Sequence, residues 1–405
     1  MTSTRLTHHH LILIALATSV LGCASTGSSL SDAELRTRSN ELAHDFIIVD
    51  GHIDVPYRMD QFWEDISQET IGGDFDYPRA IQGGMDAPFM SIYIPASYQE
   101  TGGAKEKADS LINMVEAFAN QWPDKFAIAY TVRDVRTHHR DGLISLPMGM
   151  ENGAPIGEDL SLLDYFYDRG IRYITLAHSR ANAISDSSYD STRVWNGLSP
   201  FGEDVVQRMN DIGMIVDVSH ISDSAFYDVM RISTAPVMAT HSSARRFTPG
   251  WERNMNDDML ELLAEKDGVI MISFGSSFLR TGYDAIGDSI NAALSDQMED
   301  AGLEPGTREG VLWFEEHRKA NPVGTIDDVV MHINHVVDLV GIDHVGLGSD
   351  YDGVFSLPSG LQDVSTYPDL VFELLAEGYS DEDIRKILGE NALRVWDAVE
   401  AAASD

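Results

Sequence analysis

Basic residues are scarce in this sequence. Its 405 residues hold 28 Lys and Arg against 65 Asp and Glu, which gives a formal net charge of −37 at pH 7. A protein so acidic lacks the basic footprint that nucleic-acid phosphates require. It is also repelled from anionic lipid. The charge therefore excludes nucleic acid as a partner and predicts a well-solvated surface.

Cysteine and long apolar runs are scarce as well. Cys23 is the only cysteine, so no intramolecular disulfide can form. The apolar run 11–21 has the length of a signal-peptide core and is too short to span a bilayer as a helix. It ends in Leu21-Gly22-Cys23, which resembles the lipobox of bacterial lipoproteins. We expect a signal peptide over 1–22 and a lipidated Cys23, with an ordinary cleaved signal as the alternative.

The same leader predicts where the protein resides. Residues 23–40 begin rich in Ser, Thr and Gly and are expected to form a flexible tether. The folded part would then be one domain over 41–405. We expect export to the bacterial cell envelope, on the periplasmic side, with the N-terminal lipid as the sole attachment to the membrane.

Short apolar runs alternate with amphipathic stretches along the rest of the chain. The stretches have helical periodicity and cover 105–120, 201–212, 222–231, 257–265 and 326–340. The apolar runs have the length of strands and cover 46–49, 89–94, 143–146, 173–177, 214–218, 237–239, 269–274 and 345–347. Eight strands alternating with helices predict an α/β fold, the (β/α)8 TIM-type barrel, with extra helices over 367–402. An open doubly wound sheet is the alternative, but no Gly-rich phosphate turn follows the first run.

Polar residues gather where these runs end. In Asp50-Gly51-His52-Ile53-Asp54, the imidazole and the second carboxylate are two residues apart and can project to the same side of a strand. Taken alone, this pattern also fits a polar turn. In a barrel, however, the carboxyl ends of all strands meet at one mouth. The other runs end near Glu151, His178, His220, His241 and Asp350.

These strand-end residues form a set that could hold metal. Three of the four strand-end histidines, an aspartate and Glu151, which two ions would share, supply the ligand types that divalent ions such as zinc prefer. Burying so many ionisable groups is costly unless a metal or ionic partners compensate. The set predicts two divalent ions, with Glu151 as the bridge and an acidified water between them.

The chain resembles the membrane (renal-type) dipeptidases, which are zinc-dependent peptidases with an amidohydrolase-like barrel. The resemblance covers about residue 46 to the C-terminal helices. Its carriers are Asp50-Gly51-His52-Ile53-Asp54, Gly149-Met150-Glu151, Leu176-Ala177-His178-Ser179, Asp217-Val218-Ser219-His220-Ile221-Ser222, His241-Ser242-Ser243-Ala244, Arg253-Asn254, Gly348-Ser349-Asp350-Tyr351-Asp352-Gly353, and the segment 360–370.

The resemblance implies a role for each of these residues. His52 and Asp54 would hold one zinc ion, His220 and His241 the other, and Glu151 would bridge both. His178 would not bind metal but would polarise the scissile carbonyl. Arg253 would bind the substrate's terminal carboxylate. Asp350 would carry the proton from the bridging water to the leaving amine, although Asp352 competes for this role on sequence alone.

The predicted reaction is therefore hydrolysis of dipeptides by a hydroxide that bridges two zinc ions. Manganese or cobalt would suit the same ligands. Phe278 stands where some relatives carry a tyrosine, which leaves the substrate preference open. One alternative is another amidohydrolase-type reaction, on an N-acyl amino acid, a lactone or a phosphotriester. The other is a non-catalytic binding lipoprotein of the envelope. The resemblance also implies a homodimer, although no stretch of the sequence specifies an interface.

Overall fold

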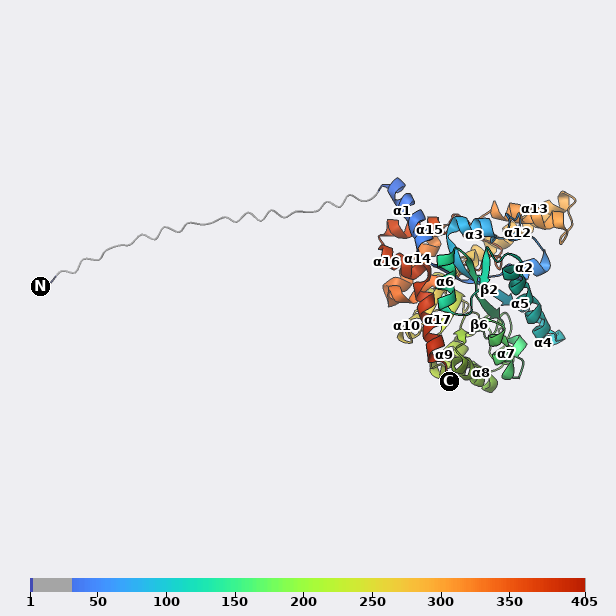
Figure 1. Ribbon diagram of the computed structural model, residues 1–405, viewed down its shortest axis with the longest axis horizontal. Coiled ribbons are helices and arrows are strands. Elements are labelled where there is room, and N and C mark those ends of the chain that lie inside the picture. Colours follow the sequence, from blue (N-terminus) through green and yellow to red (C-terminus); the bar gives the residue numbers. More distant parts are fainter. Residues whose placement is uncertain (3–30, 405) are drawn as a thin grey trace.

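Eight parallel strands close into a barrel in the computed structural model, which describes residues 1–2 and 31–404 (Figure 1). Around the barrel the strands follow the order β1-β10-β9-β8-β7-β6-β5-β2. Their bounds are β1 Ile48–Ile53, β2 Met85–Tyr93, β5 Met148–Glu151, β6 Ile171–Thr175, β7 Ile215–Asp217, β8 Met238–Ser242, β9 Val269–Ile272 and β10 Val345–Leu347. The predicted (β/α)8 barrel is confirmed, and the open doubly wound sheet is wrong.

The third predicted strand is not part of the barrel. Most of the run 143–146 forms β4 (Ile144–Leu146), which pairs with β3 (Phe126–Ile128) in a separate two-stranded sheet. The barrel strand is β5, which begins after Pro147. Proline has no N–H to donate to a ladder of hydrogen bonds, so it separates one apolar stretch into two strands.

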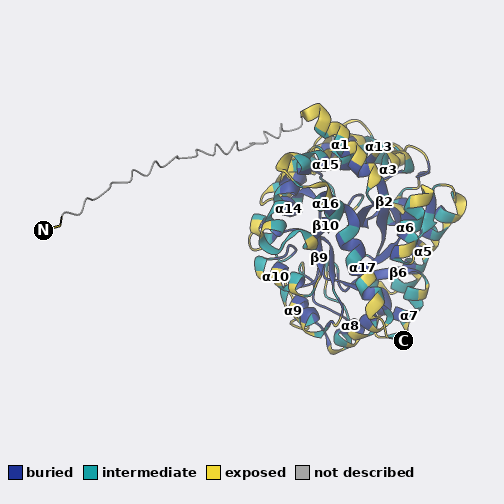
Figure 2. Cartoon of the chain, turned by 60° about the vertical axis from the view of Figure 1, so that its left-hand side comes forward, coloured by how far each residue is buried: buried dark blue, intermediate teal, exposed yellow. Residues whose placement is uncertain are grey.

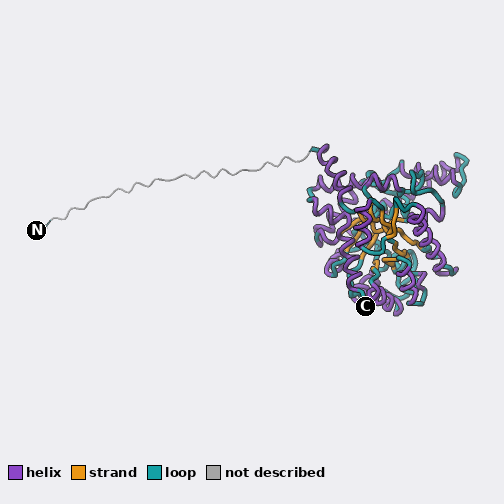
Figure 3. Tube along the Cα trace, in the orientation of Figure 1, coloured by secondary structure: helices purple, strands orange, loops and turns teal. Residues whose placement is uncertain are grey.

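A ring of helices surrounds the strands (Figure 3). The five predicted amphipathic stretches are all helical, and Figure 2 shows exposed residues on the outer side of the ring. Side chains cap several helix starts; the Ser199 side chain, for example, accepts a hydrogen bond from the Gly202 N–H. The ring comprises α5 Ala104–Gln121, α6 Val132–Asp141, α7 Ser161–Asp168, α8 Pro200–Ile212, α9 Asp223–Ile232, α10 Asp257–Glu265 and α14 Ile326–Val340.

The fold also contains short helices and one helical insertion. The insertion follows β9 and was not predicted; its helices α12 and α13 project from the barrel in Figure 1. These additional helices are α2 Val55–Gln61, α3 Tyr77–Gly83, α4 Ser97–Thr101, α11 Ser276–Leu279, α12 Tyr283–Asp300 and α13 Arg308–Lys319. The 3₁₀ turns are η1 Ala154–Ile156, η2 Arg245–Phe247, η3 Ile342–His344 and η4 Val364–Thr366.

Helix α1 (Asp32–Asp45) begins earlier than the sequence predicted. Ser31 and Glu34 form a capping box at its start, which satisfies two backbone N–H groups. Residues 32–40 are thus helical, and their assignment to a flexible tether was wrong. The predicted signal peptide and the lipidated Cys23 lie outside the described residues and stay predictions. Within the described residues, no helix is both long and apolar enough to cross a membrane.

The C-terminal helices close one end of the barrel and leave the mouth open. The predicted helical tail forms α15 (Tyr367–Glu377), α16 (Asp381–Arg385), the π-helix η5 (Lys386–Glu390) and α17 (Asn391–Ala402). Trp396 on α17 is buried against Phe89 of β2, with ring centroids 5.2 Å apart. At Gly389 a Cβ atom would meet the Ile47 carbonyl at 2.4 Å, so glycine permits the close approach of η5 to the barrel.

Candidate metal centre and active site

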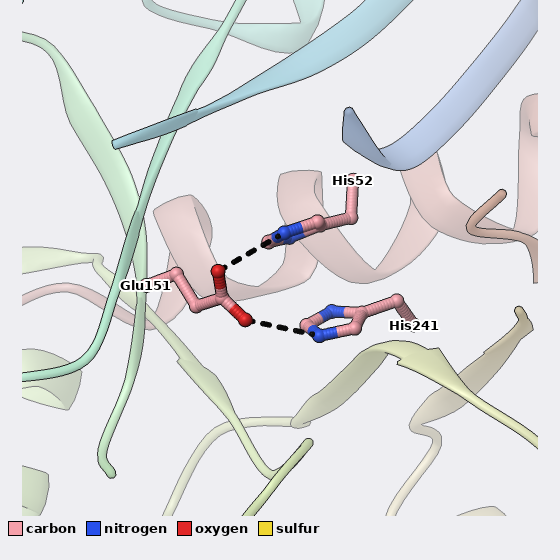
Figure 4. A group of neighbouring side chains, drawn as sticks. All are labelled: His52, Glu151 and His241. Atoms are coloured by element: carbon pink, nitrogen blue, oxygen red, sulfur yellow. Dashed lines mark ion pairs between the residues drawn. The ribbon is translucent and has the colours of Figure 1, made fainter. Parts of the chain in front are cut away.

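The Glu151 carboxylate lies at the centre of the predicted metal set. It is the last residue of β5, and its two oxygens face histidines from two other strands (Figure 4). Oε2 lies 3.4 Å from His52 Nε2, and Oε1 lies 3.4 Å from His241 Nε2. The sequence predicted that His52 follows the first strand, but it lies inside β1.

The remaining predicted ligands complete two groups around this carboxylate. Asp54 Oδ2 lies 3.3 Å from His52 Nε2. On the other side, His220 Nε2 lies 3.1 Å from Glu151 Oε1 and 2.7 Å from His241 Nε2. All five side chains are buried. The structure therefore brings together every residue that the sequence assigned to metal.

The separations between these atoms fit bound metal. Ligand atoms bonded to one zinc ion at about 2.1 Å lie about 3.4 Å apart in a tetrahedron, close to most of these separations. Among the described residues, His52 Nε2 and Asp54 Oδ1 are buried without a hydrogen-bond partner, a costly arrangement unless another group binds them. Three overlapping groups have ligand atoms within 4.8 Å of one another, and they also include His178 and Asp350.

The charge states of Glu151, His220 and His241 suit metal binding. Burial opposes ionisation of Glu151, but His178, His52 and hydrogen bonds from two further histidines hold its pKa well below the usual value. Burial and the nearby Arg253 cation lower the pKa values of His220 and His241 well below that of free histidine. An ionised carboxylate and neutral imidazoles are the forms that bind metal.

Two of these residues have a backbone conformation that is rare for side-chain-bearing residues. His220 follows β7 and Asp350 follows β10, and each has a φ of 66°. Such left-handed conformations cost about 1–3 kcal/mol and are concentrated at functional sites. Here they turn both side chains into the barrel mouth.

Asp350 and Asp352 differ in their surroundings, although both line the same cavity. The Asp352 carboxylate accepts a hydrogen bond from the Asp74 N–H at 2.5 Å and pairs with Arg58 at 3.4 Å. Asp350 instead lies among the metal set, grouped with His52 and Asp54. Burial raises its pKa to about 7, near the value that suits a group exchanging protons at neutral pH. The geometry thus favours Asp350 over Asp352 for proton transfer.

His178 lies beside the metal set, in the segment that follows β6. Its Nε2 is 3.5 Å from Glu151 Oε1, and its ring centroid is 4.3 Å from that of His220. Burial lowers its pKa below that of free histidine, so the neutral form dominates at neutral pH. Because its nitrogen also falls within one of the ligand groups, its predicted role beside the metal, rather than on it, stays a prediction.

Arg253 lies behind the wall of the cavity. Its guanidinium donates hydrogen bonds to Ser242 Oγ at 2.8 Å and to the His241 carbonyl at 2.6 Å, and its Nη2 stands 3.1 Å from His220 Nε2. It also lies 4.9 Å from the ring centre of Phe278, which lines the cavity. The predicted contact with a substrate carboxylate stays a prediction.

The open cavity at the mouth has a volume of about 330 Å³. Aromatic residues form much of its wall, and sequence reasoning missed three tyrosines there. The lining residues are Asp54, Tyr57, Tyr93, Glu151, His178, Tyr189, His220, Phe278, Asp350, Asp352, Gly353 and Val354. A cavity of this size suits a small substrate with polar groups at the metal end and apolar groups at the wall.

The loop between β6 and α8 carries Tyr189 to this wall. Its buried Asp186 carboxylate accepts hydrogen bonds from the backbone N–H groups of Val194, Trp195 and Gly197. The Asn182 side chain binds the loop in the same way, through the Ile184 N–H. The Asp186 and Asn182 side chains therefore hold the backbone of this loop in place. A run of Asp, Asn and Ser is typical of such turns.

Comparison with known proteins points to one family. Residues 36–405 match the family model described as membrane dipeptidase (peptidase family M19). An uncharacterized dipeptidase of Schizosaccharomyces pombe is 33% identical over 407 residues, covering 96% of this chain and 90% of that protein.

Solved structures agree with this match. The probable dipeptidase PvdM of Pseudomonas aeruginosa superposes with a TM-score of 0.78 and 27% identity, covering 92% of this chain and 100% of that one. A metallopeptidase of Rhodobacter sphaeroides, liganded with a phosphinate mimic of the dipeptide L-Ala-D-Ala, has a TM-score of 0.70 and 26% identity, covering 87% of this chain and 99% of that one.

Proposed function

The chain belongs to the membrane dipeptidase family (peptidase family M19), a family of metal-dependent dipeptidases, and from this premise we propose that it hydrolyses dipeptides at a centre of two zinc ions. The observation that carries the proposal is the Glu151 carboxylate, whose Oε2 faces His52 and whose Oε1 faces His220 and His241. His52 and Asp54 would hold one ion, and His220 and His241 the other. Imidazole nitrogen and carboxylate oxygen are ligands that zinc accepts readily.

The ions, when bound, supply Lewis acidity and an activated water. The chain's own residues transfer the proton and stabilise the charge on the carbonyl oxygen. As the water oxygen bonds to the carbonyl carbon, Asp350 would take the water's proton at its carboxylate oxygen and deliver it to the leaving amine nitrogen as the C–N bond breaks. His178 donates a hydrogen bond to the carbonyl oxygen, where negative charge develops. Asp350 and the five proposed ligands are buried and His178 is half-buried, and this low exposure to water strengthens both interactions.

Substrate length would be set at the other side of the cavity. Tyr189 and Phe278 line the cavity there, and Arg253 lies behind Phe278. We propose that they bind the free carboxylate of a dipeptide, which would exclude longer peptides. The solved relative that holds a mimic of L-Ala-D-Ala supports testing a D-residue at the C-terminal position.

The test is amino-acid release from a panel of L,L and L,D dipeptides by metal-replete protein, with and without a chelator. N-acyl amino acids, lactones and phosphotriesters belong in the panel because they report the alternative amidohydrolase reactions. We expect about two zinc ions per chain, release that the chelator abolishes, and almost no activity in His220→Ala. His335→Ala, on the outer helix α14, is the matched control and should keep its activity. Protein that binds no divalent metal, or a fully active His220→Ala, would refute the proposal.

We also propose that the protein is exported and anchored through a lipid on Cys23. The support is the sequence Leu21-Gly22-Cys23 after an apolar run. Labelling with a radioactive fatty acid in a bacterial host should mark the unmodified chain and leave Cys23→Ala unmarked. Label in both, or in neither, would contradict lipidation at this cysteine. The homodimer stays a prediction.

A further inference from the structure

A tyrosine contacts the first metal-ligand histidine from the far side of the barrel. Tyr173 lies on β6, fully buried, and its hydroxyl is 2.7 Å from Nδ1 of His52 on β1. These strands are not neighbours, because β2 and β5 separate them in the barrel. The phenol therefore crosses the barrel interior to reach the imidazole.

The barrel makes room for this crossing. Tyr173 pairs in register with Gly149 on β5, and a Cβ atom at Gly149 would lie 1.9 Å from Cζ of the tyrosine ring. Phe89 packs against the same ring, with centroids 5.3 Å apart. The ring is thus held between a required glycine and an aromatic neighbour. This packing leaves the hydroxyl little freedom to leave His52.

Metal binding at Nε2 would determine which nitrogen of His52 carries the proton. Nε2 faces Asp54 and Glu151 at 3.3 and 3.4 Å. A lone pair at Nε2 requires the proton to sit on Nδ1, where it can be donated to the hydroxyl oxygen of Tyr173. A tyrosine phenol is neutral at physiological pH. Histidines that bind metal commonly donate their second N–H to an oxygen, which fixes the ring.

The second metal position has a different support. His241 Nδ1 lies 2.9 Å from Thr240 Oγ1, and that hydroxyl donates to Asp217 Oδ2 at 2.8 Å. The Ser219 N–H donates to the other oxygen of Asp217, at 3.0 Å. His241 is therefore connected to a buried carboxylate through one hydroxyl, whereas His52 is connected to a neutral phenol.

We propose that Tyr173 and Thr240 are positioning residues, each serving one of two metal positions: Tyr173 through His52, and Thr240 through His241. Loss of either hydroxyl then weakens the binding of one ion and leaves the binding of the other unchanged. The inference rests on the proposed two-zinc function and deepens it. Neither residue touches the substrate or the reacting atoms.

The experiment compares Tyr173→Phe and Thr240→Val with the unmodified protein. Zinc affinity is measured by competition with a chromophoric chelator. In each variant we expect one equivalent to bind about 10- to 100-fold more weakly and the other to be unchanged. With one equivalent of zinc added, anomalous scattering should place the ion at His220 and His241 in Tyr173→Phe, and at His52 and Asp54 in Thr240→Val.

Three controls keep the result interpretable. Tyr379→Phe removes a remote hydroxyl that donates to Asn334 at 2.7 Å, and it should bind both ions normally. Thr240→Ser keeps the bridging hydroxyl and should behave as the unmodified protein. The melting temperature of the metal-free variants separates damage to the fold from damage to a metal position.

Each outcome has a defined meaning. Two equivalents bound with unchanged affinity in both variants overturn the inference. An equal loss of affinity for both ions also overturns it, because it would indicate a general effect on the barrel. Fewer than two equivalents in the unmodified protein overturn the two-zinc function itself, and the inference with it.

Discussion

Arg318 on α13 forms a buried ion pair with Asp74, whose Oδ1 lies 2.9 Å from the arginine Nη2 although the two residues are 244 positions apart in the chain. The second oxygen of Asp74 accepts the backbone N–H of Asp352 at 3.1 Å. The helical insertion after β9 is thereby connected to the loop that carries Asp350. We infer that α13 stabilises the position of this loop at the barrel mouth.

Arg318→Met should therefore destabilise the fold. Removing one partner of a buried pair costs about 3–5 kcal/mol because the other charge stays buried. Lys319 lies 3.7 Å from the same carboxylate and offsets part of this loss, so we expect about 3 kcal/mol in urea unfolding. Arg385→Met breaks an exposed pair with Glu382 and should cost less than about 1 kcal/mol. A similar small cost for Arg318→Met would contradict the role of the buried pair.

His332 should make stability depend on pH. From α14, its Nδ1 accepts the Ala244 N–H at 3.0 Å, and its Nε2 donates to the Leu279 carbonyl at 2.9 Å, so it joins the loops after β8 and β9. Burial lowers its pKa to about 4. Between pH 6.5 and 4 the unfolded chain binds more protons than the folded one, so stability falls as the pH falls through this window.

The size of this effect follows from the shift. About 2.5 pKa units correspond to about 3 kcal/mol. Between pH 7 and pH 4, metal-free protein should lose about 3 kcal/mol more stability than His332→Gln, measured by urea unfolding at each pH. The two curves should run parallel above pH 7, where the group is neutral in both states. Parallel curves over the whole range would show that His332 does not titrate as described.

Asp350→Asn should separate proton transfer from metal binding. The amide keeps the shape of the side chain but cannot take up the proton, so we expect kcat to fall about 10²- to 10⁴-fold. Zinc content, measured by atomic absorption, should stay at the unmodified level. The Asp352 carboxylate accepts a hydrogen bond from the Asp74 N–H and pairs with Arg58. Asp352→Asn should therefore change stability more than kcat. The reverse pattern would assign the proton to Asp352.

Much of the barrel could be predicted because its strands are short, apolar and separated by amphipathic helices. The site was predictable for a related reason: parallel strands share one edge, so His52, Glu151 and His241 had to meet there. The division between β4 and β5 was missed, since the apolar run conceals the break at Pro147.

Other features depend on contacts that no local pattern reveals. Helix α13 of the insertion, for example, is joined to the mouth through ion pairs of Arg318 and Lys319 with the distant Asp74. Alternation in a strand can place Tyr173 inside the barrel, but its contact with His52 depends on the glycine at 149. Arg253 lies on the loop after β8, yet its guanidinium packs behind Phe278 because Ser242 and the His241 carbonyl bind it there.

Tyr189 should contribute to recognition of the substrate carboxylate. It lines the cavity, and its ring lies 5.6 Å from that of His220 and 6.2 Å from that of Trp251. Arg253 Nη2 lies 3.1 Å from Nε2 of the same His220, so Tyr189 and Arg253 stand at one side of the cavity. Phe278 has no hydroxyl to offer on the same wall.

Tyr189→Phe tests this arrangement with two substrates that differ only at the C-terminus. For a free dipeptide we expect kcat/KM to fall about tenfold, because a hydrogen bond to a charged group is worth about 1.5 kcal/mol or more. The amide of the same dipeptide lacks the charge and should change less than about twofold on the same reasoning. Tyr227→Phe, an exposed residue on α9, serves as the matched control. An equal loss for the acid and the amide would mean that the hydroxyl positions the loop rather than the carboxylate.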